Sequence, residues 1–299
     1  MMSIGLTGWD LASLAFKACV YAAVFAGAGG VLFLAACGES LIAADRRRVE
    51  RLIGAALLLA VLLSGLRIPL LAGALSGEPA GMIDRNMLEM VLQSEEQRAA
   101  LVRIVGLVLA CAALVGTRSG GWQSLAVAGA ALAITSFAWT GHSHALPRPN
   151  AGILLHSLHL ICVAFWLGSL TPLWMIARSD ARGARTAAVA VAFGRMAVAV
   201  VSALLAAGSG LFLLMLGGWE TPRLDGTYAS LGLGKIALVA GMLALAAYNK
   251  LRLTRRLIAR DDGAARVFTF TVGMEMAFAV AVLLVTAALT TVTGPPALE

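Results

Sequence analysis

All four histidines of the chain lie in one short stretch that could bind a metal ion. His142 and His144 are separated by one residue, and His156 and His159 are separated by two. The spacing of the second pair places both imidazoles on one face of a helix. Imidazole nitrogen is a suitable ligand for copper, zinc or haem iron. The cluster therefore predicts a metal or cofactor site, with hydrogen bonding between helices as the alternative interpretation.

Three methionines could add softer ligands to such a site. Met82, Met87 and Met90 lie close together in the sequence, between two apolar stretches. A methionine thioether favours Cu(I) over harder ions. Methionine is also a common packing residue. We expect this trio on the same side of the membrane as the histidines, where it could help to bind copper.

A carboxylate and a guanidinium stand inside other apolar stretches. Glu275 lies within the last stretch and Arg195 within the sixth, at a similar predicted depth. An unpaired carboxylate is costly in lipid. We therefore expect Arg195 to pair with Glu275, either as a structural ion pair or as part of a cation or proton path.

The composition requires that these residues be positioned by membrane helices. The 299 residues are 60% hydrophobic and 13% charged, with a mean hydropathy of +0.88, whereas a soluble domain carries about 25% charged residues. Spanning a bilayer takes roughly 20 apolar residues. We predict an all-α, polytopic bundle in a single domain, residues 1–299, with eight transmembrane helices: about 12–37, 52–74, 99–116, 122–140, 152–177, 187–216, 230–249 and 267–293.

The basic residues predict the orientation of the bundle. Fourteen of them follow the first, third, fifth and seventh spans, and four lie in the opposite connections. Cytoplasmic loops are rich in Lys and Arg. We therefore expect both termini outside, in the periplasm. This distribution also explains the net charge of +7 without a nucleic acid partner.

Four cations lie in the predicted outer parts of the spans. They are Lys17, Arg67, Arg103 and Lys235. Long basic side chains near helix ends commonly reach the head groups. If they instead face the bundle interior, they would repel copper ions and favour an anionic ligand such as the propionates of haem.

Several short motifs resemble one family of membrane proteins. His159 is followed seven residues later by Trp166-Leu167-Gly168, as in the CopD/PcoD copper-resistance proteins. Further matching pieces occur in the same order: Gly141-His142, Gly208-Ser209-Gly210, Tyr228 with Lys235, and Asn249-Lys250-Leu251-Arg252-Leu253. The resemblance is best over residues 135–293 and covers the first 130 residues only by helix count and a glycine-rich first span.

The resemblance implies a bacterial inner-membrane protein of eight helices without enzymatic activity. Such proteins work with a small CopC-like periplasmic copper-binding partner, move copper inward and contribute to copper resistance. By position, His142 and His159 match the family pattern, whereas His144 and His156 are additions. The expected cargo is therefore a copper ion.

An electron-transfer protein that uses haem or quinone is the alternative function. Membrane cytochromes also bind their cofactor with histidines inside helical bundles. Their haem iron is usually held by one histidine from each of two facing helices, whereas here one predicted helix carries two histidines. We therefore favour copper transport or homeostasis.

Overall fold

The computed structural model describes residues 7–116, 120–140, 149–180, 182–215 and 227–291. Within these ranges every regular element is helical and no strand occurs. Eight of the described helices are long and apolar enough to cross a membrane, which confirms the predicted fold class. They are α1 Gly8–Cys37, α2 Ala43–Ser76, α4 Glu95–Val115, α5 Gly120–Thr135 continued by the 3-10 turn η3 Ser136–Trp139, α6 Pro149–Arg178, α7 Ala184–Met215, α8 Thr227–Tyr248 and α10 Ala264–Thr291.

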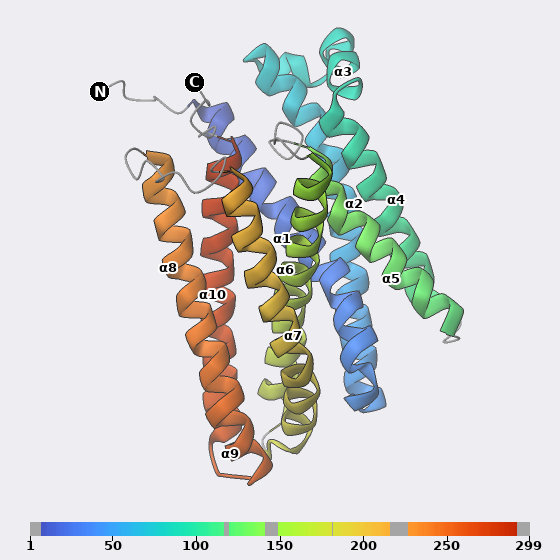
Figure 1. The fold of residues 1–299 in the computed structure, drawn as a ribbon. Coiled ribbons are helices and arrows are strands. Elements are labelled where there is room, and N and C mark those ends of the chain that lie inside the picture. The colour runs from blue at the N-terminus through green and yellow to red at the C-terminus, as the bar shows by residue number, and fades with distance from the viewer. Residues whose placement is uncertain (1–6, 117–119, 141–148, 181, 216–226, 292–299) are drawn as a thin grey trace.

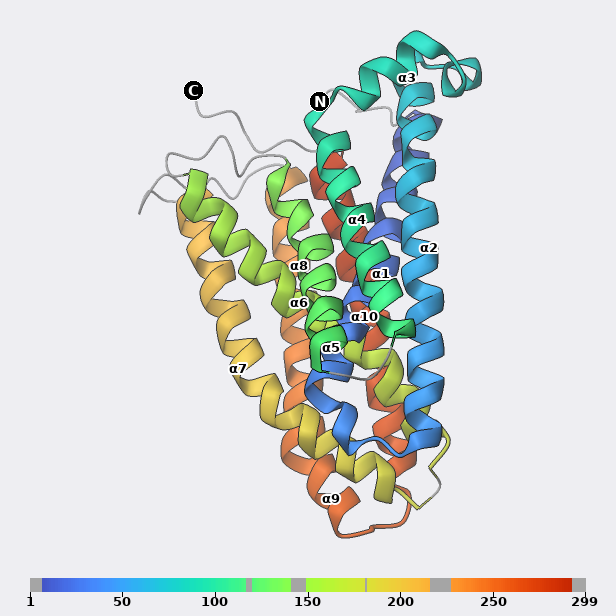
Figure 2. The same ribbon diagram turned by 90° about the vertical axis from the view of Figure 1, so that its right-hand side faces the viewer.

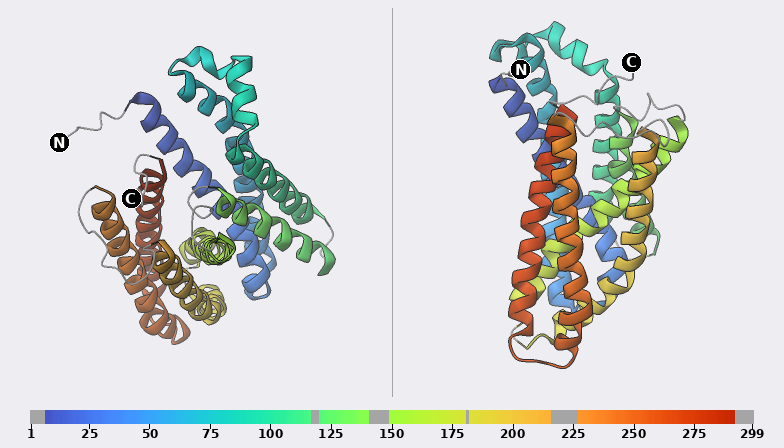
Figure 3. Two further views of the ribbon diagram at one scale, coloured as in Figure 1. Left: turned by 45° about the horizontal axis from the view of Figure 1, so that its top comes forward. Right: turned by 60° about the vertical axis from the view of Figure 1, so that its left-hand side comes forward.

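Helix α1 runs through the bundle and contacts helices from both halves of the chain (Figure 1). It packs against α2 and α5 on one side and against α6 and α10 on the other. Helices α8 and α10 lie side by side along one edge (Figure 3). The second half of the chain is therefore joined to the first mainly through α1.

Glycine allows α1 and α6 to approach each other closely. A Cβ atom added to Gly168 of α6 would lie 2.3 Å from the carbonyl carbon of Gly29 on α1, and one added to Gly29 would lie 1.8 Å from the carbonyl oxygen of Ala164. Small residues at such crossings are how helices pack tightly in lipid. The contact fixes the position of α6, which carries two of the histidines.

Two of the helical segments extend beyond the predicted apolar spans. Helix α2 begins at Ala43 rather than near 52, and α8 continues through a π-helical turn, η5 (Asn249–Leu253), into α9 (Thr254–Ile258). The hydropathy pattern marks only the apolar part of a helix, and these extensions are rich in charged residues. The helices therefore continue past the apolar limits that the sequence defines.

The connection between α2 and α4 is also helical. It contains a 3-10 turn, η2 (Pro79–Met82), and helix α3 (Arg85–Leu92), which lies across one end of the bundle (Figure 2). The side chain of Asp84 caps α3 by accepting a hydrogen bond from the backbone N–H of Met87. Such an N-cap satisfies a free amide of the first turn. We expected only a loop here, because eight residues are too few for a clear apolar period.

Helix α1 begins and α10 ends at the same end of the bundle (Figures 1 and 2). We call it the outer end, after the predicted topology. At the opposite end, Arg185 of α7 pairs with Asp45 of α2 at 2.7 Å. This ion pair involves two of the connections that are rich in basic residues.

Chemical labelling can test the predicted orientation. In a variant whose four natural cysteines are replaced, an impermeant thiol reagent added to spheroplasts should label Thr7→Cys and leave Arg182→Cys unlabelled, because loops rich in arginine stay in the cytoplasm. Permeabilised cells provide the control, since both positions should then react. Labelling of Arg182→Cys alone in intact spheroplasts would show that the bundle has the opposite orientation and would contradict the prediction.

Candidate metal site and buried carboxylate

Helix α6 places His156 and His159 one turn apart near its outer end. The Nδ1 atom of His159 is buried and makes no hydrogen bond of ordinary geometry in the described part of the chain, and the ring lies close to the backbone of Leu204 on α7. Gly208 of α7 lies against the ring, because a Cβ added there would be 3.3 Å from His159 Nδ1. Glycine at this position leaves one nitrogen of the ring without a covering side chain from α7.

A lysine lies beside both histidines. Lys235 of α8 is half-buried and interacts electrostatically with the imidazoles of His156 and His159. Like charges repel strongly where water is scarce. A cation bound by these imidazoles would therefore be held less tightly than in a neutral site.

The other two predicted histidine ligands, His142 and His144, lie outside the described residues. Within the described ranges, no three His, Cys, Asp or Glu side chains gather as a metal site would require. His156 and His159 therefore supply part of a ligand set. The predicted proximity of His142 to His159 stays a prediction.

The three methionines lie over the outer end of α2. Met82 is in η2 and packs at Gly73 of α2 beside the ring of Trp9, since a Cβ on Gly73 would touch both side chains at 2.7 Å. Met87 and Met90 lie one turn apart on α3, and Met90 is exposed. The trio is thus divided between Met82, which is packed on α2, and two methionines of α3, of which Met90 is exposed. The structure places it on the outer end with α3, as expected for the connection after α2 (Figure 2).

Glu275 of α10 is buried and bonded to neutral groups. Its side chain accepts a hydrogen bond of 2.6 Å from Asn249 Nδ2 and one of 3.3 Å from Trp166 Nε1. The hydroxyl of Thr271, one turn earlier on α10, donates to Asn249 Oδ1 at 2.6 Å. Three helical segments therefore meet at this carboxyl group.

The expected ion pair between Glu275 and Arg195 is wrong. Arg195 is an exposed residue of α7, and the described partners of Glu275 are Asn249 and Trp166. Depth along two helices does not determine which way their side chains point. The guanidinium lies near the surface, where water and head groups can solvate it.

Asn249 owes its position to the π-helical turn. It is the first residue of η5, and the next residue, Lys250, donates to the backbone oxygen of Gly194 on α7 at 2.6 Å. A π turn inserts an extra residue into a helix and often occurs at functional sites. Here it directs Asn249 to α10 and Lys250 to α7.

The outer cations of the first half face the protein. Arg67 is 7% exposed and bonds to Glu96 at 2.5 Å, and Arg103 is 4% exposed and donates to Ser136 Oγ at 3.1 Å. The guanidinium of Arg103 also lies 3.7 Å from the ring centroid of Phe137. Lys17 donates to the backbone oxygen of Thr290 in the last turn of α10. These contacts bind helices to one another, so the head-group interpretation does not hold for Arg67 and Arg103.

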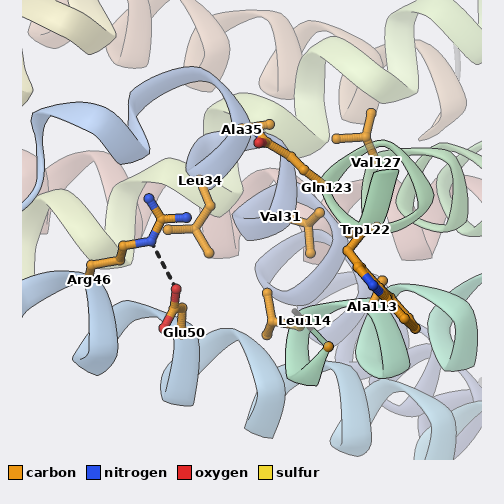
Figure 4. Close-up of a pocket in the computed structure, with 12 residues that line it drawn as sticks. Val31, Leu34, Ala35, Arg46, Glu50, Ala113, Leu114, Trp122, Gln123 and Val127 are labelled. Carbon is orange, nitrogen blue, oxygen red and sulfur yellow. Dashed lines mark hydrogen bonds and ion pairs between the residues drawn. The ribbon is translucent and has the colours of Figure 1, made fainter. Parts of the chain in front are cut away.

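A cavity between α1, α2, α4 and α5 lies away from these groups (Figure 4). It occurs where α1 and α4 end and where α2 and α5 begin. Its lining is mostly apolar, with an ion pair of 2.9 Å between Arg46 and Glu50 at one side. It brings no histidine, cysteine or methionine together, so we do not assign it to the metal site.

Comparison with known proteins agrees with this architecture. Residues 9–147 match the family model described as Copper resistance protein D-like, N-terminal domain, and residues 187–289 match the model described as Copper resistance protein D. Copper resistance protein D of Pseudomonas syringae pv. tomato is 28% identical over 265 residues, which cover 82% of this chain and 85% of that protein. No solved structure matches the chain.

The fold and these matches agree on the class of protein. Eight helices long and apolar enough to cross a bilayer make it a multi-pass membrane protein. The chain belongs to the copper resistance protein D family. This membership supports a role in copper resistance.

The structure also shows what the family-like motifs do. Trp166 donates to Glu275, Gly168 contacts α1, Gly208 lies against His159, and Asn249 bonds to Glu275. The sequence resemblance included these residues without indicating that they meet. The sequence did not reveal that Glu275 bonds to Asn249 and Trp166. The available signal was the seven-residue step from His159 to Trp166, which places Trp166 on the histidine face of α6.

Loss of the amide at residue 249 should destabilise the bundle. Asn249→Leu would leave Glu275 without its shortest hydrogen bond, which costs about 1–3 kcal/mol for a buried polar group. We expect a lower thermal unfolding temperature in detergent. Arg252→Gln changes an exposed residue of the same turn and should unfold at the parent temperature. Equal unfolding temperatures for the parent and Asn249→Leu would contradict the role of this bond.

Proposed function

We propose that this protein moves copper across the bacterial inner membrane from the periplasm and that His156 and His159 form part of the copper-binding site. The observation that carries the proposal is the pair of imidazoles one turn apart near the outer end of α6, with Nδ1 of His159 buried at the glycine of α7. Imidazole nitrogens at this spacing on one helix face can bind one metal ion together. His142 and His144 would complete the ligand set from the preceding connection.

The charge of Lys235 favours transfer over storage. Its ammonium interacts with both imidazoles and would weaken the binding of any cation there. A transport site must release its ion, so moderate affinity is an advantage. Met87 and Met90 on α3, with Met82 nearby, would receive copper at the outer surface through their soft thioether ligands.

The likeness to the family supports a partner for this outer surface. We propose that a CopC-like periplasmic protein delivers the copper ion and that the chain itself carries out no enzymatic reaction. The inner membrane is the corresponding location. The lipid bilayer is the surrounding medium of the eight apolar helices.

Haem-dependent electron transfer is less well supported by the arrangement. Both described histidines lie on α6, whereas haem is commonly held between two helices. Arg67 and Arg103 have protein partners, so neither is free to pair with a propionate in this arrangement. Purified protein should therefore contain copper and show no Soret absorption.

Binding measurements with histidine variants test the copper site. His159→Ala should lower copper affinity roughly ten- to a hundredfold, as expected from disturbance of a metal centre. Ser157→Ala, in the same helical turn, should bind copper as the parent does. Because an imidazole must be unprotonated to bind a metal, acidification should release copper from these residues.

A methionine variant separates the histidine site from a methionine site. A variant in which Met82, Met87 and Met90 are all leucine should keep this dependence on pH, because the histidines remain. If His142→Ala and His159→Ala together leave copper affinity at pH 7 unchanged while the methionine variant loses it, the site lies at the methionines instead.

A further inference from the structure

We propose that Glu275 is a proton-binding site whose hydrogen-bond partners can serve both the protonated and the ionised carboxyl group, and that copper movement is linked to proton exchange there. The second part rests on the proposed transport function. The first part concerns the resting protein and can be tested without copper. No redox step is involved, because one proton passes between the carboxyl group and water.

The surroundings of Glu275 are buried and uncharged. The residue is 3% exposed, and its two described hydrogen-bond donors, Asn249 and Trp166, are neutral. A carboxylate inside a membrane is expensive unless it is paired or takes up a proton. With neutral partners on two sides, binding of a proton removes the charge that the site would otherwise have to stabilise.

The cations on the neighbouring elements are directed elsewhere. Lys17 of α1 donates to Thr290, Lys250 of η5 donates to Gly194, and Arg256 of α9 pairs with Asp261. On α6, Arg178 lies over the ring of Trp174. On α8, Lys235 interacts with the two histidines. Three further cations of η5, α9 and α10 are exposed: Arg252, Arg255 and Arg266.

Among the described residues Glu275 forms no ion pair, and its hydrogen-bond donors, Trp166 and Asn249, are neutral. Glu275 is therefore set apart from the ion pairs that stabilise the two ends of the bundle. A structural role in an ion pair would require a cation that this part of the molecule does not supply.

Asn249 and Thr271 can accommodate either state of the carboxyl group. With Glu275 ionised, Asn249 donates through Nδ2 and accepts from Thr271 through Oδ1, as in the structure. With Glu275 protonated, its hydroxyl can donate to Oδ1 once the amide turns over. Thr271 can then accept from Nδ2, because a hydroxyl is both donor and acceptor.

Trp166 completes the arrangement because its indole N–H only donates. It can bond to the second carboxyl oxygen in both states. A change of protonation therefore requires one amide rotation and leaves no buried polar group without a partner. The hydroxyl of Thr271 also has backbone acceptors at Val267 and Phe268, which it can use when Asn249 turns.

Seven-residue steps connect this site with the proposed copper ligands. On α6, His159 and Trp166 are seven residues apart, and on α8 and η5 the same step separates Lys235, Met242 and Asn249. Residues at this spacing stay on nearly the same face of a helix. The outer residues of these two series are His159 and Lys235. The inner residues are Trp166 and Asn249, and both bond to Glu275.

Infrared spectroscopy of the full chain in lipid nanodiscs tests the proton site. At neutral pH the parent should show the C=O stretching band of a protonated carboxyl group, and the band should disappear at alkaline pH. Glu275→Gln should lack it. Glu50→Gln removes a carboxylate that pairs with Arg46 and should keep it.

Two further variants allow for a Glu275→Gln protein that does not fold. Trp166→Phe removes a donor that favours the ionised form, so its band should persist to a pH about one unit higher than in the parent. Thr271→Val should also alter the band, because the amide of Asn249 loses the group that supports both orientations. A carbonyl region that is the same at all pH values in the parent, Trp166→Phe and Thr271→Val would overturn the proton site.

Proteoliposomes test the link to copper. In the parent, copper uptake measured by metal analysis should be accompanied by a change of internal pH, and Glu275→Gln should lose the pH change. Copper uptake by Glu275→Gln with the parent's pH change would overturn the link. An absence of copper uptake by the parent would instead contradict the proposed transport function and leave the infrared result to decide on the proton site.

Discussion

A polar group in the interior of a membrane protein must find its partners within the protein, and this constraint organises the bundle. Glu275 is bonded to residues of α6 and η5, and Arg67 and Arg103 are bonded to partners on the neighbouring helices. In lipid, each such group would be costly if it stood alone. The positions and rotations of the helices are thus fixed by a few hydrogen bonds as well as by small-residue packing.

These contacts explain why the matching motifs of the second half occur where they do. Gly168 lets α6 approach α1, and two residues earlier Trp166 reaches Glu275. Gly208 lies against the ring of His159 without adding a side chain, and the π turn after α8 brings Asn249 to α10. The motifs are therefore parts of one arrangement in which one face of α6 carries both the candidate metal ligand His159 and Trp166, the donor to Glu275 of α10.

The eight helices could be predicted from hydropathy alone, because the need for apolar residues across a bilayer leaves a clear pattern. The partner of Glu275 could not, since Arg195 has the right depth but lies on an exposed face of α7. Helix α3 is too short to give a clear apolar period, and the extensions of α2 and α8 are too charged to be counted as spans. Residues 9–147 match the N-terminal domain of the family over their whole length. No single motif in this half is distinctive enough to identify the family by itself.

X-ray absorption at the copper edge tests most directly whether these histidines bind copper. For protein loaded with one equivalent of copper, we predict nitrogen neighbours at about 2 Å, the range of metal–imidazole bonds, with the outer-shell scattering of an imidazole ring. This signal should be reduced in His159→Ala and kept in Ser157→Ala. A spectrum with sulfur neighbours alone, unchanged in His159→Ala, would contradict the account.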